Sequence, residues 1–295
     1  MTAKKLRFVI FGNTFQIKKS ASIKKILACL SDYNAEVYMD SEYYHFLSDT
    51  QHIKVEATKV FEGDDFDADF VISMGGDGTF LKAASRVGFH NIPILGVNMG
   101  RLGFLADVSP DEIELCLHSL YSGDYSIEDR EVIKVETDGD RFEGSSYALN
   151  DVAILKRDNA SMIGIRTSIN GEYLTTYQAD GLIISTPTGS TAYSLSNGGP
   201  IIVPETKVFS MTAVAPHSLN IRPIVLSDKS VITLAVESRS HNFLVAIDGR
   251  SEKCKEGTTL TLSKAPYSIK IVKRSDNNYF DTLREKMMWG TDTRQ

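Results

Sequence analysis

The stretch from Phe70 to Leu81 constrains the fold of this chain more than any other. It begins as a short apolar run, which at this length predicts a buried strand. The run breaks at Gly75 and Gly76 and gives way to a helical pattern of apolar residues from Thr79. A strand that passes through a glycine loop into the N-terminus of a helix favours an anion site. The first N–H groups of such a helix point outward, and its dipole attracts negative charge.

Asp77 lies in the middle of this loop. The absence of a Cβ at Gly75, Gly76 and Gly78 lets a phosphate or a ribose approach the backbone closely. A carboxylate at this place would repel a phosphate, so its better uses are to accept a hydroxyl proton or to hold a metal that binds phosphate. A third interpretation stays open, a simple turn residue, because Asp-Gly is a common turn pair. Lys82, one turn into the helix, either faces the phosphates or is a solvated surface lysine.

The first half of the chain alternates between strands and helices. We expect strands at residues 6–11, 36–39, 70–75 and 92–97, and helices from 20, over 79–87 and from 109. The last of these has a capping box, with Ser109 as N-cap, Pro110 at N1 and Glu112 at N3. This alternation predicts a Rossmann-like α/β domain with a parallel sheet covered on both faces. Ligands bind such sheets at the carboxyl ends of the strands, where the glycine-rich stretches after residues 75 and 97 lie.

The pattern changes near residue 129, beyond which helical periodicity disappears. Short β-rich runs then follow one another at residues 132–137, 152–155, 163–169, 181–186, 208–215, 231–236, 243–247, 259–262 and 269–272. Asn170-Gly171 is typical of a tight hairpin. These runs predict an all-β sandwich domain at 129–274. The tail at 276–289 is helical again and is expected to pack on the first domain, which would then comprise residues 1–128 and 275–295.

Composition narrows the classes of function. The chain has 295 residues and a net charge of −6, with no basic patch for nucleic acid and no membrane signal. No apolar run approaches the ~20 residues that span a bilayer. The three cysteines are isolated, which favours a reducing, cytoplasmic location over a disulfide framework. The six histidines show no metal-ligand spacing.

A second polar concentration lies between Asp180 and Pro200, where a strand leads into a long hydroxyl-rich loop. Its backbone amides and its serine and threonine hydroxyls suit the ribose and phosphate groups of a dinucleotide, and the ring of Tyr193 is able to stack on a base. An ordinary sandwich loop is the alternative, since glycine, serine, threonine and proline fill loops anyway. The pair Asn150-Asp151, before a strand, is likewise either functional or a simple turn.

At this point the residues resemble a known family. Gly75-Gly76-Asp77-Gly78-Thr79 is similar to the signature that NAD kinases share with diacylglycerol-type lipid kinases and 6-phosphofructokinases. Three further stretches resemble NAD kinases specifically: residues 96–105, Asn150-Asp151 and residues 180–200. Four motifs in the right order make the resemblance strong, and the two-domain layout extends it over the whole chain. A lipid or sugar kinase and a non-catalytic dinucleotide-binding regulator remain as alternatives.

The resemblance implies transfer of the γ-phosphoryl group of ATP to the 2′-hydroxyl of the adenosine ribose of NAD, giving NADP. It also implies an active site between the domains, a divalent metal, most simply Mg²⁺, and a homo-oligomer, either a dimer or a tetramer. It names no metal ligands. It leaves open whether polyphosphate replaces ATP and whether NADH is accepted.

The resemblance also implies roles for individual residues. Asp77 would accept the proton, with Gly78 beside it on the ribose and Gly75, Gly76, Gly78 and Thr79 forming the phosphate loop. Asn150 and Asp151 would meet the adenosine portion of NAD, and Asp180 the nicotinamide side. The adenine and ribose pocket would be lined by Thr191, Ala192, Tyr193, Ser194, Leu195 and Ser196. Lys82 occupies a position that is often basic in the family. Gln178 and Arg250 depart from residues of some relatives and receive no role.

Overall fold

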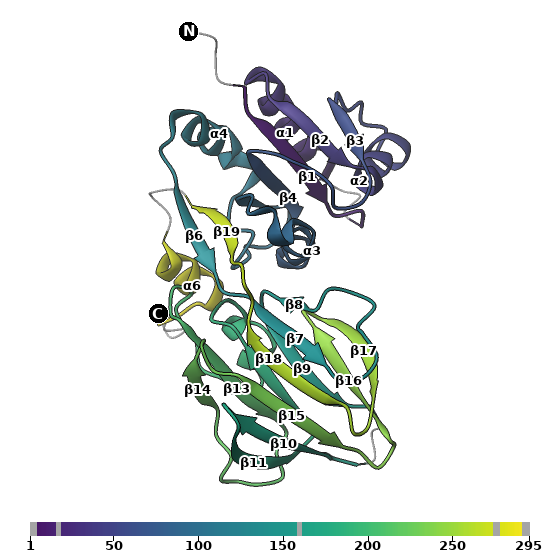
Figure 1. Ribbon diagram of the computed structural model, residues 1–295. Helices are drawn as coiled ribbons and strands as arrows, with labels where there is room; N and C mark the ends of the chain where they lie inside the picture. Colours follow the sequence, from purple (N-terminus) through teal and green to yellow (C-terminus); the bar gives the residue numbers. More distant parts are fainter. Residues whose placement is uncertain (1–4, 16–18, 158–160, 274–277, 291–295) are drawn as a thin grey trace. The chain divides into compact units, whose positions relative to one another are not determined.

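The computed structural model describes residues 5–15, 19–157, 161–273 and 278–290. The chain divides into two compact units, one formed by residues 1–129 together with 269–295 and the other by residues 130–268. The first unit combines strands with helices, whereas the second is built almost wholly of strands (Figure 1). No helix in the described part of the chain is both long and apolar enough to cross a membrane.

The first unit is built on a seven-stranded sheet with the strand order β3-β2-β1-β4-β5-β19-β6. Its strands are β1 (Arg7–Gly12), β2 (Glu36–Asp40), β3 (Lys59–Phe61), β4 (Phe70–Gly75), β5 (Ile94–Asn98), β6 (Ser126–Arg130) and β19 (Ile269–Lys273). Neighbouring strands from β3 across to β19 pair in parallel. The predicted parallel α/β sheet is confirmed.

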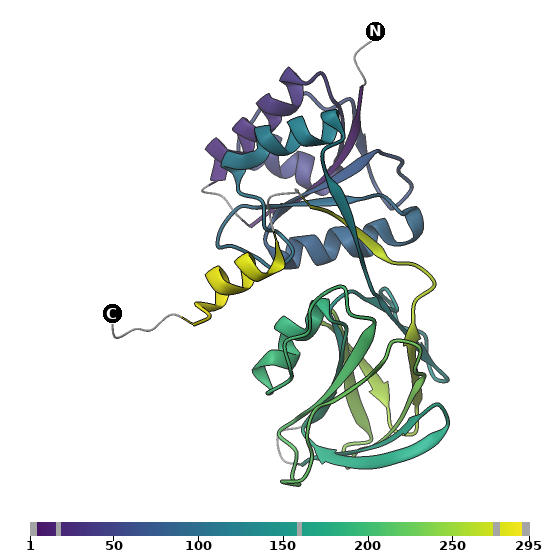
Figure 2. The same cartoon turned by 90° about the vertical axis from the view of Figure 1, so that its left-hand side faces the viewer.

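Helices cover both faces of this sheet. The helices of this unit are α1 (Ser20–Asp32), α2 (Ser41–His45) with a π-helical continuation (Phe46–Thr50), α3 (Asp77–Val87), α4 (Ile113–Ser122) and α6 (Tyr279–Met287). Figure 2 shows α1 and α4 side by side on one face and α3 on the other. The predicted capping box is present, since Ser109 N and Oγ lie 2.9 and 2.7 Å from Glu112 Oε2. It starts a 3₁₀ turn (Pro110–Glu112) that continues into α4.

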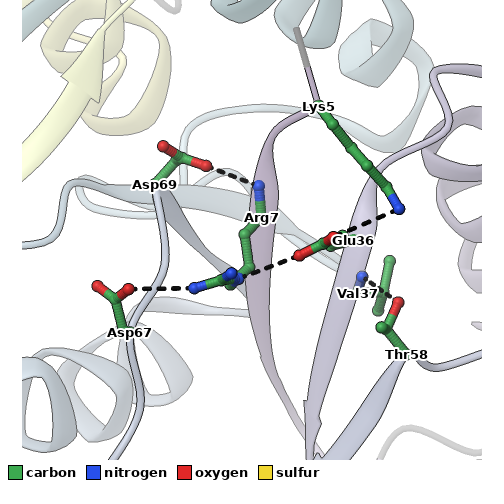
Figure 3. Close-up of polar contacts among 7 residues, drawn as sticks. All are labelled: Lys5, Arg7, Glu36, Val37, Thr58, Asp67 and Asp69. Carbon is green, nitrogen blue, oxygen red and sulfur yellow. Dashed lines mark hydrogen bonds and ion pairs between the residues drawn. The ribbon is translucent and has the colours of Figure 1, made fainter.

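Charged residues tie together the amino ends of the strands in this unit (Figure 3). The guanidinium of Arg7, at the start of β1, lies 3.2 Å from Glu36 and 3.1 Å from Asp67, and the Arg7 N–H donates to Asp69 at 2.7 Å. Lys5 pairs with the same Glu36 at 3.3 Å. These contacts hold β1 against β2 and the chain before β4, and they leave the opposite, carboxyl edge to the glycine-rich segments.

Strand β19, the last in the chain, belongs to the first sheet, although the sequence analysis predicted its residues to be part of the all-β domain. The run at 269–272 was expected in the all-β domain, but β19 pairs in parallel with β5, with Ile271 opposite Ile94. A short apolar run does not reveal which sheet it joins, because both kinds of buried strand are equally apolar. The first unit therefore resumes at residue 269, ahead of the expected boundary at 275.

The chain leaves this sheet through β6 and returns to it through β19, the neighbouring strand. The predicted helical tail at 276–289 is present as α6, although residues 276 and 277 lie outside the described residues. Thr282 and Leu283 are its buried residues, and α6 belongs to the first unit.

The second unit consists of two six-stranded sheets, with the orders β11-β10-β15-β18-β7-β8 and β14-β13-β12-β9-β16-β17. The first contains β7 (Ile133–Thr137), β8 (Tyr147–Ala148), β10 (Ile163–Ile169), β11 (Glu172–Ala179), β15 (Ile232–Glu237) and β18 (Thr259–Lys264). The second contains β9 (Asp151–Lys156), β12 (Gly181–Ser185), β13 (Val208–Val214), β14 (Ile224–Ser227), β16 (Asn242–Ile247) and β17 (Arg250–Lys255).

The two sheets are antiparallel and share one apolar core, to which both contribute. The predicted sandwich is confirmed. The expected hairpin at Asn170-Gly171 is also present, with φ angles of 52° and 84° that suit a two-residue turn, and Ile169 pairs directly with Glu172.

Candidate active site

Asp77 stands at the junction between a strand and a helix. β4 ends at Gly75, Gly76 is the N-cap, and α3 begins at Asp77 itself, two residues before the predicted start at Thr79. The residue is therefore the first of a helix and not part of a reverse turn. The register of β4 and β5 places Gly75 opposite Asn98, so the two glycine-rich segments meet at the carboxyl edge of the sheet, as expected.

The carboxylate of Asp77 accepts hydrogen bonds on both oxygens. Oδ1 receives the N–H groups of Leu105 and Ala106, each at 3.0 Å. Oδ2 receives the N–H of Phe104 at 3.0 Å and the ammonium of Lys286, on α6, at 3.3 Å. Asp77 thus ties the second glycine-rich segment to the start of α3.

These donors determine the protonation state of Asp77. Burial raises the pKa of its carboxyl group, but the N–H of Ala106, the charge of Lys286 and the N–H groups of Phe104 and Leu105 act in the opposite direction. The donors outweigh burial, and the pKa lies below its usual value. At neutral pH the group is a carboxylate, the form that is able to accept a proton.

The glycines around Asp77 fall into two kinds. A Cβ at Gly75 would lie 2.1 Å from Thr79 Oγ1, and one at Gly103 would lie 2.0 Å from Asp77 Oδ1, so packing inside the protein requires these two. A Cβ at Gly76 or Gly78 would meet no atom within 4 Å, and neither residue has a positive φ. Packing and backbone conformation do not require glycine at 76 and 78, which fits a surface kept clear for a ligand. Lys82 is exposed on α3, one turn farther along.

A second polar cluster lies in the second unit, where β9 begins. Asp248, in the turn between β16 and β17, accepts the N–H groups of Leu149 at 2.8 Å, Asn150 at 2.8 Å and Asp151 at 3.1 Å. This carboxylate fixes the backbone of the Asn150-Asp151 pair. Among the described residues, no donor lies within hydrogen-bond distance of the buried Oδ1 of Asn150. Such an orphaned acceptor fits a place where a ligand supplies the donor.

The side chain of Asp151 is buried next to that of Asp248. Burial and the neighbouring charge of Asp248 raise the pKa of Asp151 to about 7, although the N–H of Tyr193 favours the ionised form. Burial likewise raises the pKa of Asp248. The two carboxyl groups are therefore not both fully ionised at neutral pH.

This titration predicts a pH-dependent stability. An unfolded aspartate releases its proton near pH 3.9, so the folded chain retains the Asp151 proton up to about pH 7 and loses stability as the pH rises through that range. Asp151→Asn stays neutral throughout. Relative to wild type, we expect the variant to gain on the order of 2–4 kcal/mol between pH 4 and pH 8, since one pKa unit corresponds to about 1.4 kcal/mol. Urea unfolding at several pH values measures this, and parallel curves for both proteins would refute it.

The hydroxyl-rich segment is more ordered than the expected loop. It forms a 3₁₀ turn (Thr188–Thr191) followed by the one-turn helix α5 (Tyr193–Ser196). The hydroxyl of Ser194 is buried and lies 3.0 Å from that of Thr212, so it serves the interior. Tyr193, whose side chain is 40% exposed, and Ser196 face solvent, while Thr191, Ala192 and Leu195 are half-buried.

Asp180 lies away from this cluster. It precedes β12, whose first residue pairs with Leu155, whereas Asp151 pairs with Ser185 at the other end of the strand. Four residues of extended chain separate the two ends, which corresponds to about 13 Å. Asp180 forms an ion pair with Lys156 at 2.7 Å. The structure therefore brings Asn150, Asp151 and Tyr193 together but does not place Asp180 with them. Gln178 lies on β11, and Arg250 begins β17 and favours ionisation of Asp248.

The described residues do not form a metal site of their own. No three histidine, cysteine, aspartate or glutamate side chains in this part of the chain lie close enough together to hold an ion. The four donors on Asp77 also leave its carboxylate unsuited to a cation.

Comparison with known proteins gives the family. Residues 8–125 match the family model for the ATP-NAD kinase N-terminal domain, and residues 149–274 match that for the C-terminal domain. An NAD kinase of Bacteroides fragilis is 60% identical over 289 residues, which cover 98% of this chain and 100% of the relative. The chain belongs to the NAD kinase family. The expected enzyme class, a kinase that phosphorylates NAD to NADP, is confirmed, and the lipid kinase, sugar kinase and non-catalytic alternatives fall away.

Two solved structures share the fold. A yeast NADH kinase, in complex with NADH, superposes with a TM-score of 0.87 at 24% identity, over 99% of this chain and 90% of that one. An NAD kinase from Archaeoglobus fulgidus, in complex with ATP, gives a TM-score of 0.75 at 25% identity, over 96% of this chain and 99% of that one. Both support the two-domain architecture described above.

Two residues of the candidate site were absent from the sequence-based set. Asp248 stands in an Asp-Gly dipeptide that follows the apolar run at 243–247. This turn signal was available from the sequence, but it does not show which backbone N–H groups the side chain reaches. Lys286 lies 209 positions from Asp77 along the chain, and only the folded structure brings them together.

Proposed function

We propose that Asp77 accepts the proton of the 2′-hydroxyl on the adenosine ribose of NAD while the γ-phosphoryl group of ATP moves to that oxygen. A bond forms between the ribose oxygen and the γ-phosphorus as the bond from phosphorus to the ADP oxygen breaks, and the hydroxyl proton passes to the carboxylate. The observation that carries this proposal is an ionised carboxylate at the mouth of a glycine loop. The ATP complex of the Archaeoglobus fulgidus relative supports the choice of donor.

The phosphates of the nucleotide would lie against Gly76 and Gly78. The first N–H groups of a helix lack partners within the helix and favour an anion. Thr79 and Phe80 already donate to Gly76 O, so the N–H groups of Asp77 and Gly78 would be the ones to meet the phosphates. Space for a close approach exists, because no atom lies within 4 Å of where a Cβ would stand at either glycine. Thr79, which is buried, would support the loop from inside, and Lys82 would reach the phosphates from the exposed side of the helix.

The adenosine portion of NAD would meet Asn150 and Asp151. The orphaned Oδ1 of Asn150 suits a donor on the ligand, and Asp151, with its pKa of about 7, is able to donate or accept. The exposed ring of Tyr193 suits stacking on adenine, and Thr191, Ala192, Leu195 and Ser196 would line the rest of the pocket. The role of Asp180 on the nicotinamide side rests on the resemblance alone.

A divalent metal, most simply Mg²⁺, would enter with ATP. Mg²⁺ is commonly held by substrate phosphates with few protein ligands, which agrees with the lack of a three-ligand cluster among the described residues. When bound, it would neutralise phosphate charge. The free thiols of Cys29, Cys116 and Cys254 support a cytoplasmic location. A homo-oligomer, dimer or tetramer, also rests on the resemblance.

The phosphate surface can be tested without disturbing the fold. Gly78→Ala places a methyl group in open space on the first turn of α3, where alanine is favoured over glycine by about 0.4–1 kcal/mol. We expect unchanged or higher stability together with a rise in the KM for ATP of at least tenfold. Gly63→Ala is no suitable control, because its φ is 72°. Arg284→Met, at an exposed position of α6, serves instead. Normal ATP kinetics in Gly78→Ala would remove this surface from the site.

The function itself is tested by incubating the pure chain with NAD, ATP and Mg²⁺. We expect NADP carrying the new phosphate on the adenosine 2′-oxygen, and no product once the metal is chelated. Replacing ATP by polyphosphate, or NAD by NADH, settles the range of donors and acceptors. A folded chain that makes no NADP with ATP or with polyphosphate would refute the proposal.

A further inference from the structure

The carboxylate of Asp77 has no acceptor site to spare. A carboxylate offers about four lone-pair positions. Leu105 and Ala106 occupy the two on Oδ1, and Phe104 and Lys286 occupy the two on Oδ2. A ribose hydroxyl that donates to Asp77 must therefore replace one of these four donors.

Three of the donors are fixed in place. They are successive backbone N–H groups, and Leu105 and Ala106 are fully buried. The segment is closed by a hydrogen bond from Gly103 N to Ala106 O at 3.1 Å, and it packs so tightly that a Cβ at Gly103 would lie 2.0 Å from Asp77 Oδ1. Moving any of these amides would displace the whole segment.

The fourth donor is different in kind. Lys286 approaches at 3.3 Å, the longest of the four distances, and its side chain is 30% exposed. A lysine ammonium sits on a flexible stem and has water as an alternative partner. Lys286 is therefore the donor that a substrate displaces at least cost.

The position of Lys286 is nevertheless set by the fold. Tyr279, Thr282, Leu283 and Lys286 follow the i, i+3, i+4, i+7 pattern, which places them on one face of α6. Thr282 and Leu283 are the buried members of that face, and the ring of Tyr279 lies 6.3 Å from that of Phe104. The ammonium of Lys286 lies 4.5 Å from the centre of the Phe104 ring. The helix thus presents this lysine to the segment that binds Asp77.

We propose that Lys286 is a positioning residue of the transfer reaction, whose ammonium occupies the site on Asp77 Oδ2 that the ribose 2′-hydroxyl takes when NAD binds. The inference rests on the proposed role of Asp77 and adds the residue that governs access to it. In the resting chain Lys286 neutralises the half-buried carboxylate and keeps its geometry. NAD binding exchanges the ammonium for the hydroxyl.

Other charged groups near the segment do not substitute for Lys286. Asp107 follows Ala106, but it is buried and forms an ion pair with Lys273 on β19. Lys286, on α6, is the charged side chain that acts on the pKa of Asp77, and the remaining influences are burial and backbone N–H groups. Removal of the lysine is therefore expected to raise the pKa of Asp77.

The direction in which the NAD affinity changes on substitution of Lys286 tests the proposal. Lys286→Met keeps an unbranched stem over Phe104 but removes the competitor, so NAD should bind about two- to fivefold tighter, the worth of a partly exposed ion pair. Lys286→Arg strengthens the competitor through its two-pronged guanidinium and should weaken NAD by a similar factor. Arg284→Met, on the same helix and paired with Asp281, is the matched control and should leave the affinity unchanged. Calorimetry measures all four proteins.

An NAD analogue without the adenosine 2′-hydroxyl completes the experiment. It cannot take the place of the ammonium, so its affinity should be equal in wild type and Lys286→Met. If Lys286→Met binds NAD no tighter than wild type, or binds NAD and the analogue with the same gain, the inference is wrong. If wild type itself does not distinguish NAD from the analogue, the fault lies with the proposed contact between the hydroxyl and Asp77.

A second measurement does not depend on substrate. Carbon-13 NMR of chains labelled at the aspartate carboxyl carbon, with Asp77→Asn to assign the signal, gives the pKa of Asp77 directly. The pKa should rise in Lys286→Met and stay as in wild type in Arg284→Met. An unchanged Asp77 titration in a folded Lys286→Met chain would show that the ammonium does not act on this carboxylate, and it would overturn the inference.

Discussion

Replacement of Asp77 by asparagine is expected to lower kcat for NADP formation by about 10²–10⁴-fold, the usual contribution of a general base. Asparagine has nearly the same size, but its amide does not take up a proton at neutral pH. Asp77 is the first residue of α3 and not part of a turn. The ease with which Asn-Gly pairs form turns therefore gives no reason to expect that asparagine keeps the activity. Steady-state assays at saturating ATP and NAD measure the effect, and near-normal turnover would exclude Asp77 as the proton acceptor.

The structure shows what else this substitution changes. The amide oxygen of asparagine can still accept from Leu105 and Ala106, but its NH₂ group would face the N–H of Phe104 and the ammonium of Lys286. A donor left without an acceptor costs about 1–3 kcal/mol when it is buried, and less here because the side chain at position 77 is 30% exposed. The variant is therefore expected to be less stable, and its thermal unfolding has to be measured so that turnover is compared at a temperature where both chains are folded.

Asp248→Ala is expected to have the largest effect on stability. It removes the acceptor for three successive N–H groups, those of Leu149, Asn150 and Asp151. We expect a loss of about 3 kcal/mol or more in the free energy of unfolding, because each buried donor left unsatisfied costs about 1–3 kcal/mol. NAD affinity should fall as well, since the backbone that presents Asn150 and Asp151 is no longer held.

Relief of repulsion between Asp248 and Asp151 would offset part of this loss. Unfolding is therefore best measured near pH 5.5, where Asp151 is largely protonated. Asp140→Ala is the matched control: this aspartate belongs to the same unit, is exposed and pairs with Lys255 at the surface. Its removal should change stability by less than about 0.5 kcal/mol. Equal free energies of unfolding of Asp248→Ala and Asp140→Ala would show that the three hydrogen bonds to Asp248 do not stabilise the fold by the expected amount.

The fold could be predicted from the sequence wherever strands are buried. The strands absent from the predicted runs are β3, β6, β8, β11, β14 and β17, which are the edge strands of the three sheets. Of these, β11 was implied only as the partner strand of the hairpin at Asn170-Gly171. Edge strands face solvent along one side. β17, for example, reads Arg-Ser-Glu-Lys-Cys-Lys and has one buried residue, Cys254. Apolar periodicity indicates which residues are buried. It therefore does not predict a strand that is held mainly by backbone pairing with one neighbour.

The candidate site divides in the same way. Asp77 and its glycines were predicted because a strand, a glycine loop and a helix leave a local pattern in the sequence. The second binding segment of Asp77, from Gly103 to Ala106, was recognised only as glycine-rich, since backbone N–H donors carry no residue signature. Lys286 and Asp248 act through contacts between residues far apart in the chain. Asp180 and Asp151 were assigned to opposite portions of NAD, and they stand at opposite ends of paired strands, a separation that the sequence alone does not give.

The central claim is that Asp77 acts on the ribose hydroxyl during the transfer itself, and not only as the anchor of residues 104–106. Rapid-quench single-turnover measurement of NADP formation in Asp77→Asn, combined with the Kd for NAD of the same preparation, separates the two. A group that works in the transition state lowers the rate of the chemical step and leaves substrate binding nearly intact. We predict a single-turnover rate reduced by about 10²–10⁴-fold with a Kd within about threefold of wild type. A normal single-turnover rate, or a defect that lies wholly in the Kd, would contradict the claim.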